Sequence, residues 1–260
     1  MITTFRSEWI LLNRARLWII TGLTTVVFTV VATSLAISTA KPFLQAPDAG
    51  LVLEALLGSG GATAAVIFSV AFSSILVLAA FASSTGNEFT RGTLRAALTH
   101  QPRRWALMGG KLAARVTVAA ILMALALVVG AATSAIVAPA QDIDTTGWFG
   151  VDALSQAAGD YVRLLGFVVV YALIGTMVAV LVRSTPIALA ICLVWFGPLE
   201  NVIGEGRAWA DRWFPGLLLR SMLQPDNPGS VASGTAVATL AVYAAVCAGV
   251  IAVVMARRDA

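Results

Sequence analysis

The stretch from Leu112 to Ala138 reads LAARVTVAAILMALALVVGAATSAIVA and carries one charged side chain, Arg115, near its start. A helix rises about 1.5 Å per residue, so this stretch is long enough to cross roughly 30 Å of hydrocarbon. Together with five other apolar runs, this stretch predicts an all-α integral membrane fold of six transmembrane helices within a single domain, residues 1–260. The other five apolar runs are residues 17–40, 62–85, 161–182, 186–203 and 234–256.

The composition excludes an ordinary soluble domain. Of the 260 residues, 59% are hydrophobic and only 12% are charged, with a mean hydropathy of +0.89, whereas soluble domains carry about 25% charged residues. The net charge of +4 does not indicate nucleic-acid binding, because the basic residues lie beside the apolar runs. We therefore expect membrane lipids, and no nucleic acid, among the partners.

Two of the runs have a second interpretation. The first run ends in Ser38-Thr39-Ala40, which resembles a signal-peptide cleavage site, but its apolar part exceeds the usual signal core of about 7–15 residues. The fifth run ends in Phe196-Gly197-Pro198, and proline interrupts helices. The fifth span is therefore predicted either to cross obliquely or to finish early.

Lysine and arginine residues set the expected orientation, because cytoplasmic loops are enriched in them. With the N-terminus in the cytoplasm, twelve of the 17 Lys and Arg residues fall on the inner side. Both termini are therefore predicted to be cytoplasmic, and the chain to be a multi-pass protein of the cell inner (plasma) membrane.

The apolar runs contain almost no side chains that could drive transport or catalysis. Ionisable groups at membrane depth cost about 2.5–3.5 kcal/mol each, and ion-coupled transporters usually retain them. Gly110-Lys111 does not complete a nucleotide-binding motif, because Trp105 and Leu112 occupy positions that need glycine and a hydroxyl. It indicates a tight turn before a snorkelling lysine. His100, the only histidine, has no apparent partners. We predict no catalytic residue, cofactor or metal site on this chain.

The longest inner segment, residues 87–111, contains a candidate functional element. Leu94 and Leu98 are four residues apart on one face of a predicted helix, and Arg91 and Arg95 are four apart on another. This pattern is typical of a short amphipathic helix.

The boundaries of that helix are suggested by three residues. Asn87 can cap its start, Glu88 suits the positive end of the helix dipole, and Pro102 should end or kink it. A basic loop held at anionic lipid headgroups is the alternative interpretation.

The same segment resembles a known family, the type-two (drug and polysaccharide exporter-like) permeases of ATP-binding cassette exporters. That family has a glutamate, then Gly-Thr-Leu, then a proline followed by arginine and a lysine entering the next span. The matching positions are Glu88, Gly92, Thr93, Leu94, Pro102, Arg104 and Lys111. The resemblance implies a coupling helix that docks on a separate nucleotide-binding ATPase, which carries the ATP and magnesium. The implied ATPase-coupling residues are Glu88, Arg91, Gly92, Thr93, Leu94, Arg95, Leu98, Arg103 and Arg104.

Two further segments fit the resemblance. Phe5, Trp9 and Leu12 form an apolar stripe that predicts an interfacial helix within residues 1–16. Residues 204–233 contain tryptophans and prolines that predict short interfacial or re-entrant helices between the last two spans. A plain amphipathic loop resting on the membrane is the alternative for this second segment.

The resemblance implies an exporter in which two permease chains, identical or homologous, pair around a path for an expelled substrate. A path lined by apolar and hydroxyl side chains favours a hydrophobic or amphipathic substrate. Aromatic residues at such spacings are more often ordinary helix packing or lipid contacts. The alternative function is a membrane anchor or sensor subunit without transport. The candidate path residues are Phe68, Phe72, Ile75, Trp195 and Phe196.

Overall fold

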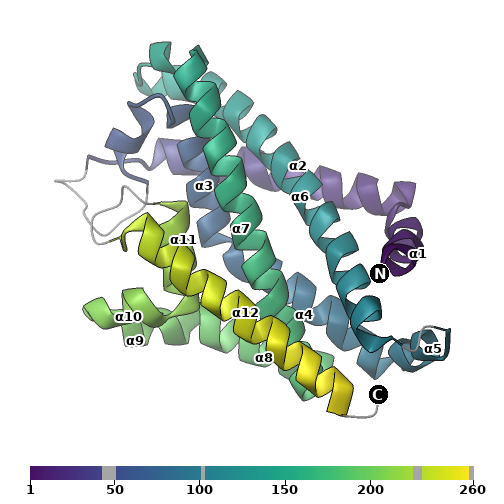
Figure 1. Cartoon of the computed structure of the whole chain (residues 1–260). Helices are drawn as coiled ribbons and strands as arrows, with labels where there is room; N and C mark the ends of the chain where they lie inside the picture. Colours follow the sequence, from purple (N-terminus) through teal and green to yellow (C-terminus); the bar gives the residue numbers. More distant parts are fainter. Residues whose placement is uncertain (43–50, 101–102, 225–229, 258–260) are drawn as a thin grey trace. The chain divides into compact units, whose positions relative to one another are not determined.

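The structure is a computed structural model that describes residues 1–42, 51–100, 103–224 and 230–257 (Figure 1). Pro102 and the side chains of Phe72, Arg95 and His100 lie outside what it describes. Within the described ranges the chain is helical, without strands, and Lys41 and Val52 form an isolated backbone bridge. The predicted all-α fold is confirmed.

Five helical segments are long and apolar enough to cross a membrane. Their outward faces are apolar too: Ile19, Leu23 and Val31 on the first are each more than 60% exposed. Such surfaces are stable in hydrocarbon and costly in water. The chain is therefore a multi-pass helical membrane protein. The five segments are α2 (Ala15–Ser38), α6 (Arg104–Val137) with the 3₁₀ turn η2 (Ala138–Gln141), α7 (Val151–Val182), residues 185–204, and α12 (Ser233–Arg257).

The predicted second span, residues 62–85, is not one straight helix. It consists of α3 (Gly61–Phe72) and α4 (Ser74–Thr90), with a break at Ser73. Serine side chains can hydrogen-bond nearby backbone groups and so compete with the helix, and Ser73 and Ser74 follow one another here. The count reaches six spans only if this broken pair crosses as one.

The segment 185–204 continues past Pro198 instead of finishing early. It begins as α8 (Thr185–Val194), widens into a π-helical turn, η4 (Trp195–Leu199), and ends as α9 (Glu200–Gly204). A proline removes one backbone donor, and the π turn around Pro198 accommodates this loss within a continuous helix.

Short helices account for most of the remaining described residues. The predicted N-terminal helix ends at Leu12, before residue 16. Two helices lie between the last two spans, as predicted, and their re-entrant geometry stays a prediction. The short helices are α1 (Ile2–Leu12), α5 (Thr93–His100), α10 (Ala208–Trp213) and α11 (Pro215–Leu223), with the 3₁₀ turns η1 (Leu53–Leu56) and η3 (Thr146–Phe149).

The chain divides into two compact units. Unit 2 comprises Asn13–Phe72 and Ala119–Gly166, and its core includes Trp148, whose indole Nε1 donates to the Leu56 carbonyl at 3.0 Å. Unit 1 comprises Met1–Leu12, Ser73–Val118 and Phe167–Ala260. In unit 1, α4 packs on α8 and α11 packs on α12. The candidate coupling segment belongs entirely to unit 1.

Candidate coupling site at the α4–α5 junction

The coupling segment starts later than the sequence predicted. Asn87 and Glu88 lie in the last turn of α4, where Asn87 accepts the Arg91 N–H at 2.9 Å through its carbonyl, so Asn87 is not a helix cap. Gly92 then takes a left-handed backbone conformation (φ 68°), which suits glycine because it lacks a Cβ. The short helix α5 begins at Thr93. Arg91 therefore lies at the break rather than on the predicted helix.

The predicted apolar face of α5 is confirmed. Leu94 is 1% exposed and packs in a cluster to which Leu98 adds a partly buried side chain. Arg104 reinforces this packing, because its Nη1 donates to the Met255 carbonyl of α12 at 2.8 Å. The helix α5 is thus attached to the ends of three long helices. Its buried partners are Leu107 and Met108 of α6, Val180 of α7, and Ile251 and Met255 of α12.

Glu88 points into a largely buried network of four charges. Its Oε1 accepts from Lys111 Nζ at 2.9 Å and also pairs with Arg115 Nη2. Glu8 of α1 binds the same two cations, with Lys111 at 3.2 Å and Arg115 at 2.9 Å. Arg115 also donates to Thr85 Oγ1 at 3.2 Å. Two acids and two bases balance one another, which is what makes buried charges tolerable.

A glycine allows α1 to approach this network closely. A methyl group at Gly110 would lie 2.7 Å from Thr4 Cβ and 2.9 Å from the Met1 carbonyl oxygen. Gly110 and Lys111 lie inside α6, so the predicted tight turn with a snorkelling lysine is wrong. The glycine is needed for helix contact, and the lysine binds two carboxylates.

The turn between α7 and α8 packs against the end of α4. Thr185 Oγ1 donates to Asn87 Oδ1 at 3.1 Å and lies 3.2 Å from Thr90 Oγ1. Within this turn Arg183 has a left-handed backbone (φ 55°), which is uncommon for a residue other than glycine. Its guanidinium lies over the Phe89 ring, 5.8 Å from the centroid.

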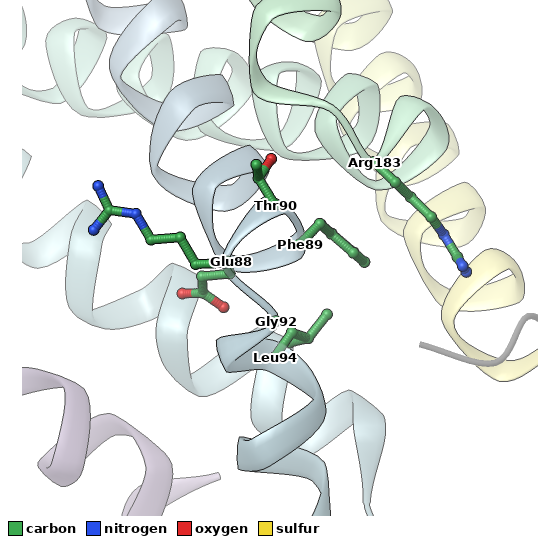
Figure 2. Close-up of a pocket in the computed structure, with 7 residues that line it drawn as sticks. Glu88, Phe89, Thr90, Gly92, Leu94 and Arg183 are labelled. Atoms are coloured by element: carbon green, nitrogen blue, oxygen red, sulfur yellow. The ribbon is translucent and has the colours of Figure 1, made fainter.

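A pocket of about 500 Å³ lies where the α4–α5 break meets this turn. Figure 2 shows Phe89 and Leu94 directed toward the side on which Arg183 lies, while the Glu88 carboxylate points away from it. The pocket is lined by Glu88, Phe89, Thr90, Arg91, Gly92, Leu94 and Arg183.

The predicted coupling residues therefore take different positions. Arg91, Gly92, Thr93 and Arg103 are exposed around the junction, whereas Leu94 and Glu88 face the protein. Four charged residues of this site were not predicted from the sequence, although Lys111, Arg115 and Arg183 lie beside or within apolar runs. The missed residues are Glu8, Lys111 as an ion-pair partner, Arg115 and Arg183.

The candidate path residues are divided between the two units. Phe68 packs against the core of unit 2. In unit 1, Phe196 contacts Tyr171 with ring centroids 5.7 Å apart, and Trp195 contacts Phe214 at 6.0 Å. Ile75 of α4 lies close to Gly197, which belongs to the same π turn as Trp195 and Phe196. These contacts are ordinary aromatic and aliphatic packing, so a substrate path through them stays a prediction.

Glu200 is the buried acid of the fifth segment. It is 1% exposed, and its Oε1 accepts from Trp195 Nε1 at 2.9 Å. The backbone N–H groups of Gly216 and Leu217, at the start of α11, also donate to this carboxyl. The N-terminus of a helix offers such unpaired donors. Glu200 therefore fastens α11 to the end of the fifth segment.

In the part of the chain that the structure describes, no three His, Cys, Asp or Glu side chains gather as a metal site. No protein-family model matches this sequence, and no curated protein matches it.

Proposed function

We propose that the chain is the membrane-spanning permease subunit of an ATP-binding cassette exporter in the plasma membrane. In this proposal both termini are cytoplasmic, and a separate ATPase chain binds α5 and hydrolyses ATP. The exported molecule is hydrophobic or amphipathic. The observation that supports the proposal most is the attachment of α5 to several long helices at one end of unit 1.

That attachment would let a docked protein move the membrane segments. Leu94 joins α5 to α6, α7 and α12 through a buried apolar cluster, while the ion-pair network joins α1 and the first turns of α6 to the end of α4. A close-packed interface transmits displacement because it resists compression. Movement of α5 would therefore displace the ends of α6, α7 and α12 together.

The energy for this movement would come from the partner. A bound ATPase shifts the permease between two conformations only by its unequal affinity for them. Closure of the ATPases upon ATP binding supplies that difference in affinity between the two conformations. A second permease chain, identical or homologous, completes the pathway, because the five or six spans of one chain enclose little space by themselves.

The test is purification of the complete chain from its native host in mild detergent, followed by identification of partners and measurement of ATP hydrolysis. We expect a partner that contains a phosphate-binding loop and hydrolyses ATP. The variant Ala96→Trp places a bulky side chain on the exposed face of α5 and should lower recovery of that partner about tenfold or more, since overpacking costs about 1–3 kcal/mol and about 1.4 kcal/mol is a factor of ten in affinity.

The matched control is Ala256→Trp, at an exposed position near the end of α12. It should leave recovery of the ATPase unchanged. If the unmodified chain copurifies with no ATPase, the anchor or sensor function gains support instead. If the chain alone pumps solute against a gradient in sealed vesicles, the proposal is wrong.

A further inference from the structure

Unit 2 contains a pocket of about 500 Å³ between the start of α3, the end of α6 and the start of α7, with η3 on one side. Six alanines from these three helices line it. Their small side chains leave the space between the helices unfilled. A volume of this size is within the range of small-molecule sites, so the pocket can hold a ligand of that class.

The polar side chains of the pocket wall are largely occupied by the protein itself. Trp148 Nε1 donates to the Leu56 carbonyl at 3.0 Å, and Thr63 Oγ1 donates to Asp160 Oδ2 at 2.5 Å. An indole and a hydroxyl have one hydrogen each to donate. Ser59, the other polar side chain of the wall, is half-buried. A polar ligand group would find few partners here, so the part of a ligand that enters should be apolar.

The position of the pocket along α6 places it at one boundary of the hydrocarbon. Arg115 is the last charged residue of α6, and charged side chains avoid the hydrocarbon. Counting about 20 residues from Arg115, the number that a crossing needs, reaches Ala135, which lines the pocket. The pocket therefore lies where the hydrocarbon meets the headgroup layer, at the membrane face opposite to Arg115.

Three large apolar side chains of the wall are exposed at this depth. Phe149, Val151 and Leu154 are each more than 70% exposed, although they precede the fourth apolar run. Water covers such side chains unfavourably and gains few hydrogen bonds in an apolar cavity, and an empty cavity loses contacts with its lining. An alkyl chain from the adjacent hydrocarbon would cover these side chains and fill the cavity.

We propose that the pocket binds one alkyl chain of an amphipathic molecule, with the polar head of that molecule outside the wall. A membrane phospholipid and a single-chain amphipath share this chemistry. Binding in unit 2 requires no ATPase, so it is tested separately from the proposed function.

Fluorescence quenching by a brominated chain tests the contact directly. Stearic acid brominated at mid-chain is added to the complete chain in mild detergent, and Trp148 reports contact because it lines the pocket and bromine quenches a nearby indole. We expect quenching that saturates at a low ratio of probe to detergent and that unlabelled stearic acid reverses. Trp148→Phe should remove this saturable part and leave the quenching of the other tryptophans.

Two neighbouring alanines of α7 provide a matched pair of variants. Ala157 lines the pocket, whereas Ala158 is exposed and does not line it. Ala157→Phe fills the space and should weaken the saturable quenching tenfold or more, while Ala158→Phe should leave it unchanged. Equal quenching in both variants would overturn the assignment, because chains would then only cover the outside of the protein. If Ala157→Phe loses its folded peak in size exclusion, Ala135→Phe fills the same pocket from α6 and carries the same expectation.

Native mass spectrometry of the chain as purified from its host distinguishes the two sources of the alkyl chain. A two-chain phospholipid that the unmodified chain retains and Ala157→Phe loses would identify a membrane lipid. A single-chain amphipath with the same behaviour would identify a molecule other than the bulk lipid, and either result supports the pocket. Identical bound molecules in both proteins, without saturable quenching, would show that the pocket binds no chain. Recovery of the ATPase is measured apart from these experiments, so its failure would count against the proposed function alone.

Discussion

Unit 1 stabilises two buried glutamates in different ways. Glu88, at the end of α4, is neutralised by the cations Lys111 and Arg115. Glu200, inside the fifth membrane segment, is held mainly by N–H donors from Trp195 and from the start of α11, and Arg220 adds a smaller electrostatic attraction. Glu88 lies just past an apolar run, where lysine and arginine can be placed at little cost. Glu200 lies within a membrane-crossing segment, where a partner cation would carry its own desolvation penalty.

The difference has a mechanical consequence. The ion pairs of Glu88 join three chain segments that are far apart in sequence, since Glu8 lies on α1, Glu88 on α4 and both cations on α6. The hydrogen bonds of Glu200 join neighbouring short elements. The first arrangement ties α1 and α4 to the long helix α6, and the second holds α11 against the end of a single segment.

Removal of a shared cation should break the Glu88 arrangement with the largest effect. Arg115→Met leaves Glu8 and Glu88 with one cation between them, and breaking a buried ion pair by removing one partner costs about 3–5 kcal/mol. We expect a large fall in the apparent melting temperature in detergent, followed by fluorescence-detected size exclusion. The double variant Glu88→Gln with Arg115→Met restores the balance between Glu8 and Lys111 and should recover much of that loss. Equal or greater loss in the double variant would show that charge balance is not the stabilising feature.

A methyl group added next to the Glu200 carboxyl should have the next largest effect on stability. A methyl group at Gly216 would overlap the Glu200 Oε2 atom and approach Phe196 to 3.2 Å, so Gly216→Ala must displace the carboxyl or the start of α11. Overpacking of this kind costs about 1–3 kcal/mol. The control Gly234→Ala, with nothing within 4 Å of the added methyl, should keep or slightly raise the melting temperature. If the two variants behave alike, Glu200 does not fix the position of α11.

These two glutamates also separate what could be predicted from the sequence and what could not. Apolar runs predicted the long helices, because membrane spanning requires a local stretch of apolar residues. The spacing of Leu94 and Leu98 likewise predicted the buried face of α5. The start of that helix was predicted incorrectly at Asn87, because the end of α4 depends on distant contacts with Lys111, Arg115 and Thr185. No local pattern records such pairings.

The break in the second span follows the same reasoning. Residues 62–85 are continuously apolar, and apolar character alone does not distinguish a continuous helix from a broken pair. The adjacent Ser73 and Ser74 were the local signal for the break. For Glu200 the sequence showed only an acid near a span end, since its partners on α11 lie more than ten residues away.

Glu200→Gln tests the hydrogen bonds of Glu200 with a smaller change in side-chain size. The amide keeps the size of the side chain but replaces one acceptor oxygen by a donor, so one of the N–H groups that face Glu200 loses its partner. An unsatisfied buried donor costs about 1–3 kcal/mol. Trp195→Phe removes one of those donors, so the two substitutions should be less than additive in a double-mutant cycle measured by thermal unfolding. Strict additivity would mean that the indole and the carboxyl do not interact.

The smallest effect is expected at the α7–α8 turn. Thr185→Val keeps the shape of the side chain and removes the hydroxyl that donates to Asn87 Oδ1 and faces Thr90, which should cost about 1 kcal/mol. Thr185→Ser retains the hydroxyl and should stay close to the unmodified protein in melting temperature. The ion-pair network fixes α4 from its other side, so Thr185→Val should leave the end of α4 folded. Thr185→Val could instead lose as much stability as Arg115→Met. The turn, rather than the four charges, would then hold the end of α4 in place, and the ion pairs of Glu88 would not be what joins α1, α4 and α6.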